Sequence, residues 1–312
     1  MEAVGTAMGA SRDYPWSKGR GLAMSIHDKF LDGSTLHSRA IARIREFCGG
    51  KKVLCAFSGG KDSQACYHLL EESGVQFHAE YSVTRFEPPE LWRFIRFHYP
   101  AVTFRRAYRR SLVTDIRLKG LPNRWARWCC AAKHVKTPGA DIVVIGIRWE
   151  ESARRRETWR MFGLKPDKTA YLCPICDWST ADVWEYLAGR PHCSLYDQGF
   201  ARIGCVCCPL SPRTMERDIS RWPKTAAMLR MGADRFVDRM RRQGFVTQAG
   251  RGCSDWCRAS SPEDEYWARW VATGQTAMPA SPDVMDDDGC LFAGSGFSES
   301  DGEDGDGSGG LP

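Results

Sequence analysis

The chain has 312 residues, of which 43% are hydrophobic and 26% are charged, as in ordinary globular proteins. No apolar run approaches the roughly 18 residues of a membrane-spanning helix, and residues 1–24 lack the apolar core of a signal peptide. We therefore expect a cytoplasmic protein with no membrane partner. Because cytoplasmic thiols stay reduced, the fourteen cysteines indicate metal or redox chemistry rather than disulfides.

The net charge of +6 is distributed unevenly along the chain. Residues 1–282 carry a net charge of +15, whereas residues 283–312 hold nine acids, no Lys or Arg, and many Gly and Ser. Such a tail buries too little apolar surface to offset its ordering entropy, so we expect disorder there and in the aperiodic residues 1–24. Between these ends, the predicted organisation is a main domain over 25–212 and a basic, mostly helical extension over 213–282.

Short apolar runs alternate with helical stripes from residue 53 onward. Strands are predicted at 53–57, 75–81, 102–108 and 141–149, and the last of these is the most apolar. Helices are predicted at 61–73, after Pro88-Pro89 and at 180–187. This alternation is typical of an α/β protein with a parallel sheet covered by helices on both faces.

A glycine-containing loop follows the first predicted strand. It reads Ser58-Gly59-Gly60-Lys61-Asp62-Ser63 and opens the next helix. The glycines let the backbone approach an anion, and the helix start supplies unpaired N–H groups and the positive end of its dipole. Lys61 adds a charge, and Asp62 is a candidate ligand for Mg²⁺ on a pyrophosphate. The GxxxxGK[ST] spacing of kinase-like P-loops is absent. We predict a phosphate-binding loop of another kind, with a plain Gly-Gly turn as the alternative.

The loop resembles the PP-loop of the adenine nucleotide alpha hydrolases, and later segments resemble motifs of the phosphoadenosine phosphosulfate (PAPS) reductase family. These segments are Gly146-Ile147-Arg148 with Glu151-Ser152 and Arg154; Pro174-Ile175 with Asp177-Trp178 and Asp182-Val183-Trp184; and Leu195-Tyr196 with Gly199 and Arg202-Ile203-Gly204-Cys205. The family includes PAPS and adenosine phosphosulfate (APS) reductases, the small subunit of ATP sulfurylase and the ATP pyrophosphatase of DNA phosphorothioation systems. The resemblance covers about residues 48–212. It implies a Rossmann-like domain with a parallel five-stranded sheet.

Arginines follow the most apolar predicted strand. Arg148 lies at its carboxyl end, where open α/β sheets bind ligands, and Arg154 follows within two turns. The forked guanidinium group suits phosphate and sulfate. Together with the motif, this position indicates that Arg148 contacts the nucleotide and that Arg154 stabilises developing charge. The alternative is a solvated charge run, and the roles of Arg155 and Arg156 stay open.

A tandem cysteine pair and a later C-x-x-C resemble the cluster-binding pattern of the iron–sulfur APS reductases. This resemblance implies that a [4Fe–4S] cluster, which needs four thiolates, is bound by Cys129, Cys130, Cys205 and Cys208. Lys133, one helical turn beyond the tandem pair, is positioned to donate to a cluster sulfur or to substrate.

Two other interpretations of the cysteines stay open. The first is zinc, bound by Cys173-x-x-Cys176 together with Cys205-x-x-Cys208. The resemblance implies a strand at Cys173 and Cys176, which opposes zinc, because residues i and i+3 of a strand point to opposite faces. The second is no metal, because free cysteine is a common core residue. Core packing suits Cys48, Cys55 and Cys66. No role is assigned to Cys207, Cys253 and Cys257.

Two features separate the reactions within the family. Sulfonucleotide reductases carry a nucleophilic cysteine in a C-terminal E-C-G-L-H motif, which this sequence lacks; Cys290 has neither the Glu before it nor the His after it. The complete Ser-Gly-Gly-Lys-Asp-Ser loop is the form in members that cleave ATP between the α- and β-phosphates. We therefore predict a PP-loop ATP pyrophosphatase that uses ATP with Mg²⁺, releases pyrophosphate and couples this step to sulfur transfer.

In this prediction Lys61, Asp62 and Arg154 are catalytic, and residues 58–63 with Arg148 bind the nucleotide. The expected partners are an adenine nucleotide, a sulfur donor or reductant protein, and a nucleic acid (tRNA or DNA) on the basic body. Residues 213–242 contain nine Lys and Arg and four acids. They form either a surface that binds nucleic acid or a solvated helical face. The alternative functions are an APS or PAPS reductase and a non-catalytic iron–sulfur protein that binds nucleic acid.

Overall fold

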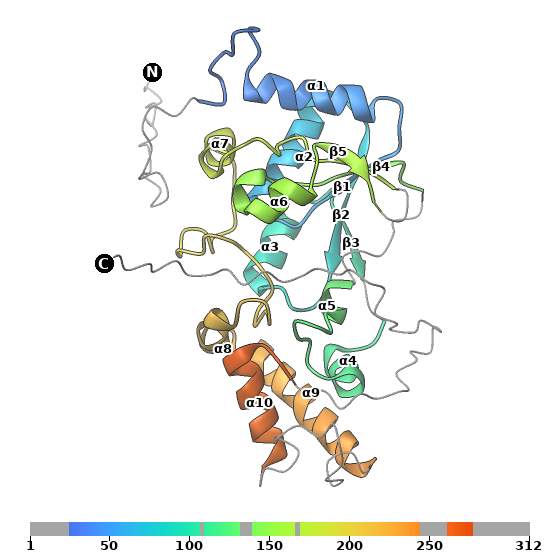
Figure 1. Ribbon diagram of the computed structural model, residues 1–312, viewed down its shortest axis with the longest axis vertical. Coiled ribbons are helices and arrows are strands. Elements are labelled where there is room, and N and C mark those ends of the chain that lie inside the picture. Colours follow the sequence, from blue (N-terminus) through green and yellow to red (C-terminus); the bar gives the residue numbers. More distant parts are fainter. Residues whose placement is uncertain (1–24, 107–108, 132–138, 166–168, 244–260, 277–312) are drawn as a thin grey trace, which may run out of the picture.

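The structure is a computed structural model that describes residues 25–106, 109–131, 139–165, 169–243 and 261–276 (Figure 1). Its centre is a six-stranded sheet with the order β3-β2-β1-β4-β6-β5. The strands are β1 (Val53–Ala56), β2 (Phe77–Val83), β3 (Thr103–Arg106), β4 (Ile142–Val144), β5 (Phe162–Leu164) and β6 (Ala170–Leu172). Five strands are parallel, and β5 pairs antiparallel with β6.

The predicted α/β class is confirmed, and the predicted count of five strands is extended by one. The additional strand, β5, has three residues, which is too short for an alternating pattern to reveal it. Consecutive residues of β1 and β4 are buried, so helices and loops cover both faces of the sheet. The predicted disordered ends, 1–24 and 283–312, lie outside the described residues.

Helix α2 (Lys61–Ser73) connects α1 (Leu36–Cys48) with α7 (Thr180–Tyr186). It packs against both α1 and α7. Its Glu72 carboxylate accepts hydrogen bonds from the His37, Tyr186 and Arg190 side chains, which belong to α1, α7 and the turn after α7. The helices of the sheet domain are α1 (Leu36–Cys48), α2 (Lys61–Ser73), α3 (Pro89–His98), α4 (Leu112–Lys119), α5 (Trp128–Ala131), α6 (Ala153–Thr158) and α7 (Thr180–Tyr186).

Three C-terminal helices form a layer below the sheet: α8 (Met215–Arg221), α9 (Pro223–Arg242) and α10 (Pro262–Thr273) (Figure 1). Helix α9 packs on α4, and α10 packs on α9. The fully buried Tyr266 accepts a hydrogen bond from the Leu121 N–H at 2.9 Å, and Trp270 donates to the Pro122 carbonyl at 2.7 Å. The C-terminal helices therefore hold the segment that leads into α5.

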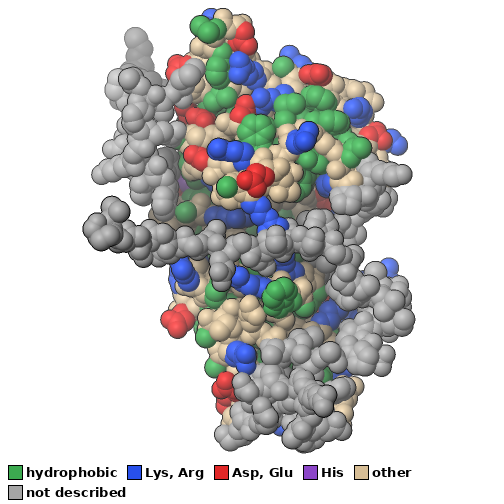
Figure 2. All heavy atoms as spheres, in the orientation of Figure 1, with side chains coloured by type: hydrophobic (Ala, Val, Ile, Leu, Met, Phe, Trp, Pro, Cys, Tyr) green, Lys and Arg blue, Asp and Glu red, His purple; other side chains and the backbone are tan. Residues whose placement is uncertain are grey.

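Lys and Arg side chains lie on both parts of the face shown in Figure 2, including the waist between the sheet and the lower helices. Within the described ranges, no helix is long and apolar enough to cross a membrane.

Candidate active site

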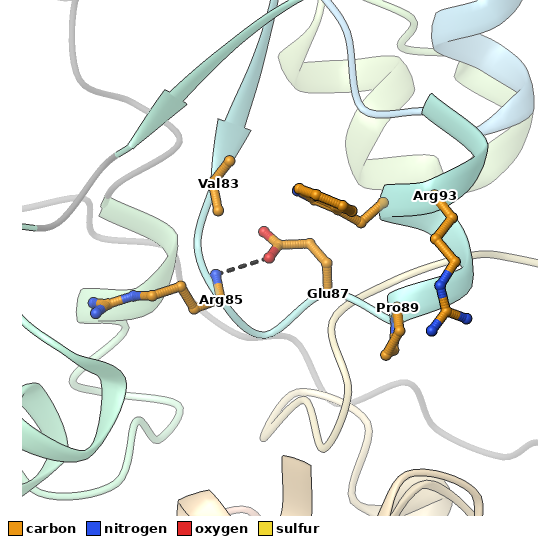
Figure 3. Close-up of a pocket in the computed structure, with 6 residues that line it drawn as sticks. Val83, Arg85, Glu87, Pro89 and Arg93 are labelled. Carbon is orange, nitrogen blue, oxygen red and sulfur yellow. Dashed lines mark hydrogen bonds between the residues drawn. The ribbon is translucent and has the colours of Figure 1, made fainter. Parts of the chain in front are cut away.

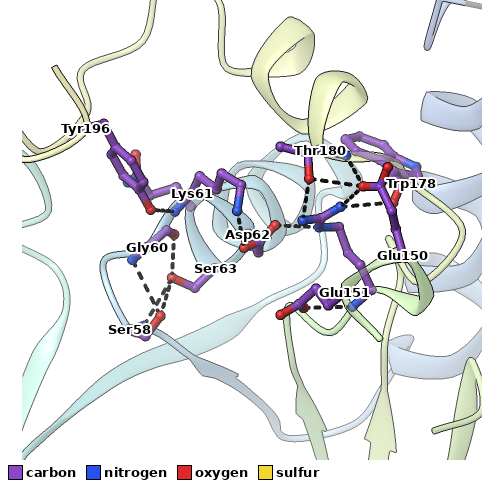
Figure 4. A network of polar contacts seen from close by, with 12 residues as sticks. Ser58, Gly60, Lys61, Asp62, Ser63, Glu150, Glu151, Trp178, Thr180 and Tyr196 are labelled. Carbon is purple, nitrogen blue, oxygen red and sulfur yellow. Dashed lines mark hydrogen bonds and ion pairs between the residues drawn. The ribbon is translucent and has the colours of Figure 1, made fainter. Parts of the chain in front are cut away.

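The predicted phosphate loop, residues 58–63, connects β1 to α2 (Figure 4). Gly59 has a φ of +73°, a left-handed conformation that L-residues rarely adopt. A Cβ on this residue would lie 2.7 Å from Ile95 Cδ1 of α3. Glycine is therefore needed at position 59 both for its conformation and for the close approach of α3.

Hydrogen bonds order this loop around the amino end of α2. The Lys61 N–H donates to the Tyr196 hydroxyl at 2.9 Å. Ser63 Oγ accepts from the Ser58 N–H at 3.1 Å and donates to the Gly60 carbonyl at 2.9 Å. The positive end of the α2 dipole favours an anion at this place.

Asp62 lies between two cations in the first turn of α2. Its carboxylate oxygens contact Lys61 Nζ at 3.0 Å and Arg148 Nε at 2.6 Å. Arg148 is 2% exposed and also donates to Glu150 at 2.8 Å and to the Thr180 hydroxyl at 3.0 Å. Burial by itself would lower the pKa of Arg148, but the adjacent carboxylates, Asp62 first, outweigh it and raise that pKa. Arg148 therefore holds the Asp62 carboxylate in place.

A cavity of about 350 Å³ opens over this loop. It lies at the carboxyl ends of β1 and β4, where the strand order changes direction and where α/β sheets bind ligands. Arg155 and Arg202 bring positive charge to its wall, and Tyr196 lines it beside the loop. Cys205 also lines the cavity, so the predicted nucleotide site adjoins the predicted cysteine site.

The four cysteines assigned by resemblance lie in one neighbourhood. Cys129 and Cys130 are on α5, with their sulfurs 4.0 Å apart. The hydrogen bond with Cys130 and burial raise the pKa of Cys129, and Cys205 and Cys208 lie near enough to raise it further. Cys207, which lies between the last two, is fully buried in the core.

The C-terminal helices hold the loop that carries Cys205 and Cys208. Cys207 has a φ of +53°, an uncommon left-handed conformation for a residue other than glycine. Its N–H donates to the buried carboxylate of Asp218 on α8 at 3.0 Å, and the Val206 N–H donates to the Phe86 carbonyl at 2.6 Å. These contacts stabilise a turn that the local sequence by itself disfavours.

A model of the phosphoadenosine phosphosulfate reductase domain family matches residues 52–211, about half of the chain. The chain belongs to this family.

Several curated proteins are similar to this member of the PAPS reductase family. An uncharacterized protein of Methanocaldococcus jannaschii is 30% identical over 206 residues, which are 59% of this chain and 43% of that protein. An adenosine 5'-phosphosulfate reductase of Lysinibacillus sphaericus is 32% identical over 95 residues, 28% of this chain and 41% of that enzyme. The chain thus spans less than half the length of these relatives. The solved PAPS reductase of Candida auris, in a phosphate complex, has a TM-score of 0.41 and 14% identity, covering 53% of this chain and 87% of that one.

The structure brings most of the sequence-predicted nucleotide residues to one cavity. Its lining from the predicted loop is Ser58, Gly60, Lys61, Asp62 and Ser63. Gly59 instead packs against α3, and Arg148 is buried behind Asp62. Arg154 is exposed on α6, whereas its neighbour Arg155, which the sequence left open, lines the cavity and pairs with Glu151 at 2.8 Å. Nucleotide contact by Arg148 and charge stabilisation by Arg154 stay predictions.

Glu151, Tyr196 and Arg202 are among the residues of this cavity to which sequence reasoning gave no role. All three lie in segments that resemble the PAPS reductase family, so the motifs contained the signal. Tyr196 is 135 residues from the N–H group that it caps, and no local pattern indicates that contact.

The second C-x-x-C, at Cys173 and Cys176, does not lie on a strand as the resemblance had implied. Strand β6 ends at Leu172, and the Cys176 N–H donates to the Cys173 carbonyl at 3.2 Å, which forms a turn. The two buried thiols pack with Ile147 and Tyr171 in a small cluster of their own. Burial raises the pKa of Cys173 to about 12 and that of Cys176 to about 11. Strand geometry therefore no longer argues against a zinc site at Cys173 and Cys176. The side chains around these two thiols are nevertheless apolar.

No group of three Cys, His, Asp or Glu side chains in the described part of the chain converges into a closed metal site. The thiols near Cys129 are nevertheless of the ligand type that iron–sulfur clusters and zinc take. Core packing of Cys48, Cys55 and Cys66 is confirmed, since all three are buried. Lys133, Cys253, Cys257 and Cys290 lie outside the described residues.

The basic residues of 213–242 are largely paired within the molecule. Arg230 contacts Asp234 at 2.7 Å and Asp264 at 2.5 Å. The other pairs are Arg217 with Asp218, Arg221 with Glu90, Arg239 with the Leu118 carbonyl, Arg241 with Glu263, and Arg242 with Asp238. Much of the charge on this stretch therefore stabilises the helical layer.

Proposed function

We propose that this member of the PAPS reductase family cleaves ATP between its α- and β-phosphates and couples the reaction to sulfur transfer. An acceptor nucleophile attacks the α-phosphorus and pyrophosphate leaves. Sulfur from a donor at the sulfide level then attacks the adenylated acceptor, and AMP leaves with the oxygen that it activated. The observation that carries the proposal is the complete loop over 58–63 around a helix amino end, beside a cavity that Arg155 and Arg202 line.

The chain's own residues have separate roles in this proposal. The loop and the amino end of α2 bind the pyrophosphate part of ATP with its Mg²⁺. Lys61 stabilises the charge that develops on the leaving group. Asp62, whose carboxylate Lys61 and Arg148 already orient, would hold the Mg²⁺ ion through its remaining lone pairs. Arg155 lines the cavity, so we assign it the charge-stabilising role predicted for Arg154.

The thiols of Cys129, Cys130, Cys205 and Cys208 are the proposed ligands of a [4Fe–4S] cluster, with zinc as the alternative. When bound, such a cluster would supply iron that can coordinate the sulfur to be transferred. Cys205 lies in the wall of the nucleotide cavity, which supports this assignment because sulfur would be handled next to the adenylated atom. Metal analysis after anaerobic purification checks it: we expect about four irons and four sulfides per chain, and stoichiometric zinc without iron would contradict the cluster.

Pyrophosphate release tests the proposed reaction. The purified protein is incubated with ATP, Mg²⁺ and candidate acceptors, and both AMP and pyrophosphate are measured. We expect Lys61→Ala to lower turnover at least about 100-fold, as removal of a transition-state donor does. Lys224→Ala is the matched control, because Lys224 is exposed on α9. The proposal fails if the wild type releases no pyrophosphate, or if Lys61→Ala retains full turnover.

Reduction of a sulfonucleotide is a second candidate, favoured by the relatives named adenosine 5'-phosphosulfate reductase. It is tested by adding APS or PAPS with reduced thioredoxin and measuring sulfite. Sulfite formation in the absence of ATP cleavage would establish this alternative. A protein that only senses nucleotide while binding nucleic acid would show neither product.

A further inference from the structure

A second cavity, of about 380 Å³, adjoins the nucleotide cavity (Figure 3). Its lining consists of Val83, Arg85, Glu87, Pro89, Trp92 and Arg93. Glu87 lines both cavities, so the two spaces have a common wall. This volume lies within the range of about 300–1,000 Å³ that is usual for ligand pockets.

The loop that forms this wall is held in a defined conformation. Glu87 accepts hydrogen bonds from the N–H groups of Thr84 and Arg85, each at 2.7 Å (Figure 3 shows the second). Arg85 has a φ of +72°, and its guanidinium group donates to the buried carboxylate of Asp115. A left-handed arginine persists only where surrounding contacts determine it. The cavity is therefore built by the fold and does not depend on a flexible loop.

Trp92 presents an aromatic surface at this cavity. It is 41% exposed, so its ring is accessible to a ligand. The Arg96 guanidinium lies 4.9 Å from its ring centroid, and the ring of Phe104 packs against it edge-on at 5.8 Å. An exposed tryptophan beside arginines is the arrangement on which unpaired nucleobases stack.

The chain around this cavity is strongly basic. Residues 91–131 contain ten Lys and Arg and a single acid, Asp115, which pairs with Arg85; Glu87 of the cavity wall and Glu90 come just before this stretch, and Arg105 within it pairs with Glu80. Arg93 and Arg96 are exposed on α3, and the pairing of β2 with β3 sets the exposed Arg106 beside Val83 of the cavity wall. By contrast, most arginines of 213–242 have carboxylate partners within the protein. The charge around Trp92 therefore complements a polyanion better than the helical layer does.

We propose that the Trp92 cavity binds single-stranded nucleic acid, with an unpaired base stacked on Trp92 and phosphates beside Arg93, Arg96 and Arg106. The strand then lies next to the ATP cavity, and one of its nucleotides is the acceptor. The role as acceptor rests on the proposed function, whereas the binding does not. Duplexes are excluded as ligands of the cavity, because a paired base cannot reach Trp92 without leaving its stack.

Fluorescence anisotropy with the full chain tests this binding in the absence of ATP, so its outcome does not depend on whether ATP is cleaved. The probes are labelled 15-nucleotide RNA and DNA single strands and a DNA duplex of the same sequence. We expect single strands to bind more tightly than the duplex. Trp92→Ala should weaken their binding about 10-fold, and Trp92→Phe should retain most of it. Comparison of the affinities for the RNA and DNA probes shows which of the two nucleic acids the cavity binds.

Charge variants separate this cavity from the helical layer. Arg93→Glu should weaken binding and reduce the dependence of log affinity on log salt by about 0.7 for each phosphate that the protein no longer neutralises. Arg235→Glu, an equal charge change at an exposed position of α9, should have little effect. Equal weakening by both variants, equal binding of duplex and single strands, or an acidic peptide that binds in place of the oligonucleotides would each overturn the proposal. Circular dichroism melting verifies that each variant is folded.

Discussion

At the scale of single residues, Arg148 connects three parts of the site. Its guanidinium group contacts Asp62 of α2, Glu150 after β4, and Thr180 at the start of α7. Because Arg148 is almost completely buried, these contacts are screened little by solvent. Arg148, which the sequence predicted to contact the nucleotide, is thus placed to position Asp62, the carboxylate that would hold Mg²⁺ in our proposal.

Arg148→Lys tests this positioning role. Lysine keeps the charge but loses the forked geometry that reaches three partners at once. We expect kcat for pyrophosphate release to fall about 10-fold while KM for ATP changes little. A rise in KM with unchanged kcat would instead indicate direct contact between Arg148 and bound ATP. Thermal melting distinguishes either result from simple unfolding.

The two loop glycines provide a matched pair. Gly59→Ala places a Cβ 2.7 Å from Ile95 in a left-handed conformation, and we expect a loss of about 2 kcal/mol in the free energy of unfolding. Gly60 has a φ of −77°, and a Cβ there meets Ser58 Oγ at 3.5 Å, so the stability of Gly60→Ala should stay within about 0.5 kcal/mol of the wild type. Urea denaturation measures both values. Equal stability of the two variants would contradict the observed loop conformation.

At the scale of elements, α2 connects the sheet, the loop over residues 58–63 and two further helices. Its first turn carries Lys61 and Asp62, and its last turn carries Glu72, which bonds to α1 and to the region of α7. Burial by itself would raise the pKa of Glu72. Hydrogen bonds from His37, Tyr186 and Arg190 outweigh burial and lower that pKa. The contacts of Glu72 therefore stabilise the folded state when its carboxylate is ionised.

This lowered pKa predicts an acid-sensitive contribution to stability. The contribution is fully present above the unfolded-state pKa of about 4.3 and is lost as pH falls through the lower folded-state pKa. Glu72→Gln should be less stable than the wild type by about 1 kcal/mol at pH 7, a modest value because the site is exposed. The difference should shrink below about pH 4. Urea denaturation from pH 7 to pH 3 checks this trend, and a difference that is constant with pH would refute it.

At the scale of the whole molecule, the C-terminal helices complete the family domain instead of standing beside it. Helix α9 packs on α4, which the family match contains, and α10 bonds to the segment before α5. Asp218 of α8 holds the loop between Cys205 and Cys208. Both halves of the cysteine neighbourhood thus depend on helices beyond residue 212. The boundary predicted there separates segments in sequence, but these segments share one core.

Truncation tests this dependence. A chain that ends at residue 212 exposes the buried Ile116 and Leu121 of α4 and the turn that follows it, so we expect aggregation or a melting temperature lowered by more than about 10 °C. A chain that ends at residue 282 keeps α8–α10 and should melt as the full chain does. Size-exclusion chromatography and thermal melting of the two truncated chains measure this difference. Cooperative unfolding of the shorter chain at the wild-type temperature would show that the family domain is independent.

The sequence by itself determined the α/β class, the position of the loop over 58–63 and the family, because these depend on short-range patterns: apolar runs, glycines at a strand end and motif spacing. It also identified four cysteines that the fold places in one neighbourhood. Only the tertiary structure decided that Arg148 supports Asp62, that Arg155 rather than Arg154 lines the cavity, and that Asp218 holds the turn of Cys207. Arg148 and Asp62 are 86 residues apart, and such contacts depend on how helices pack against the sheet. Local sequence determines which groups are available, and packing determines which of them meet.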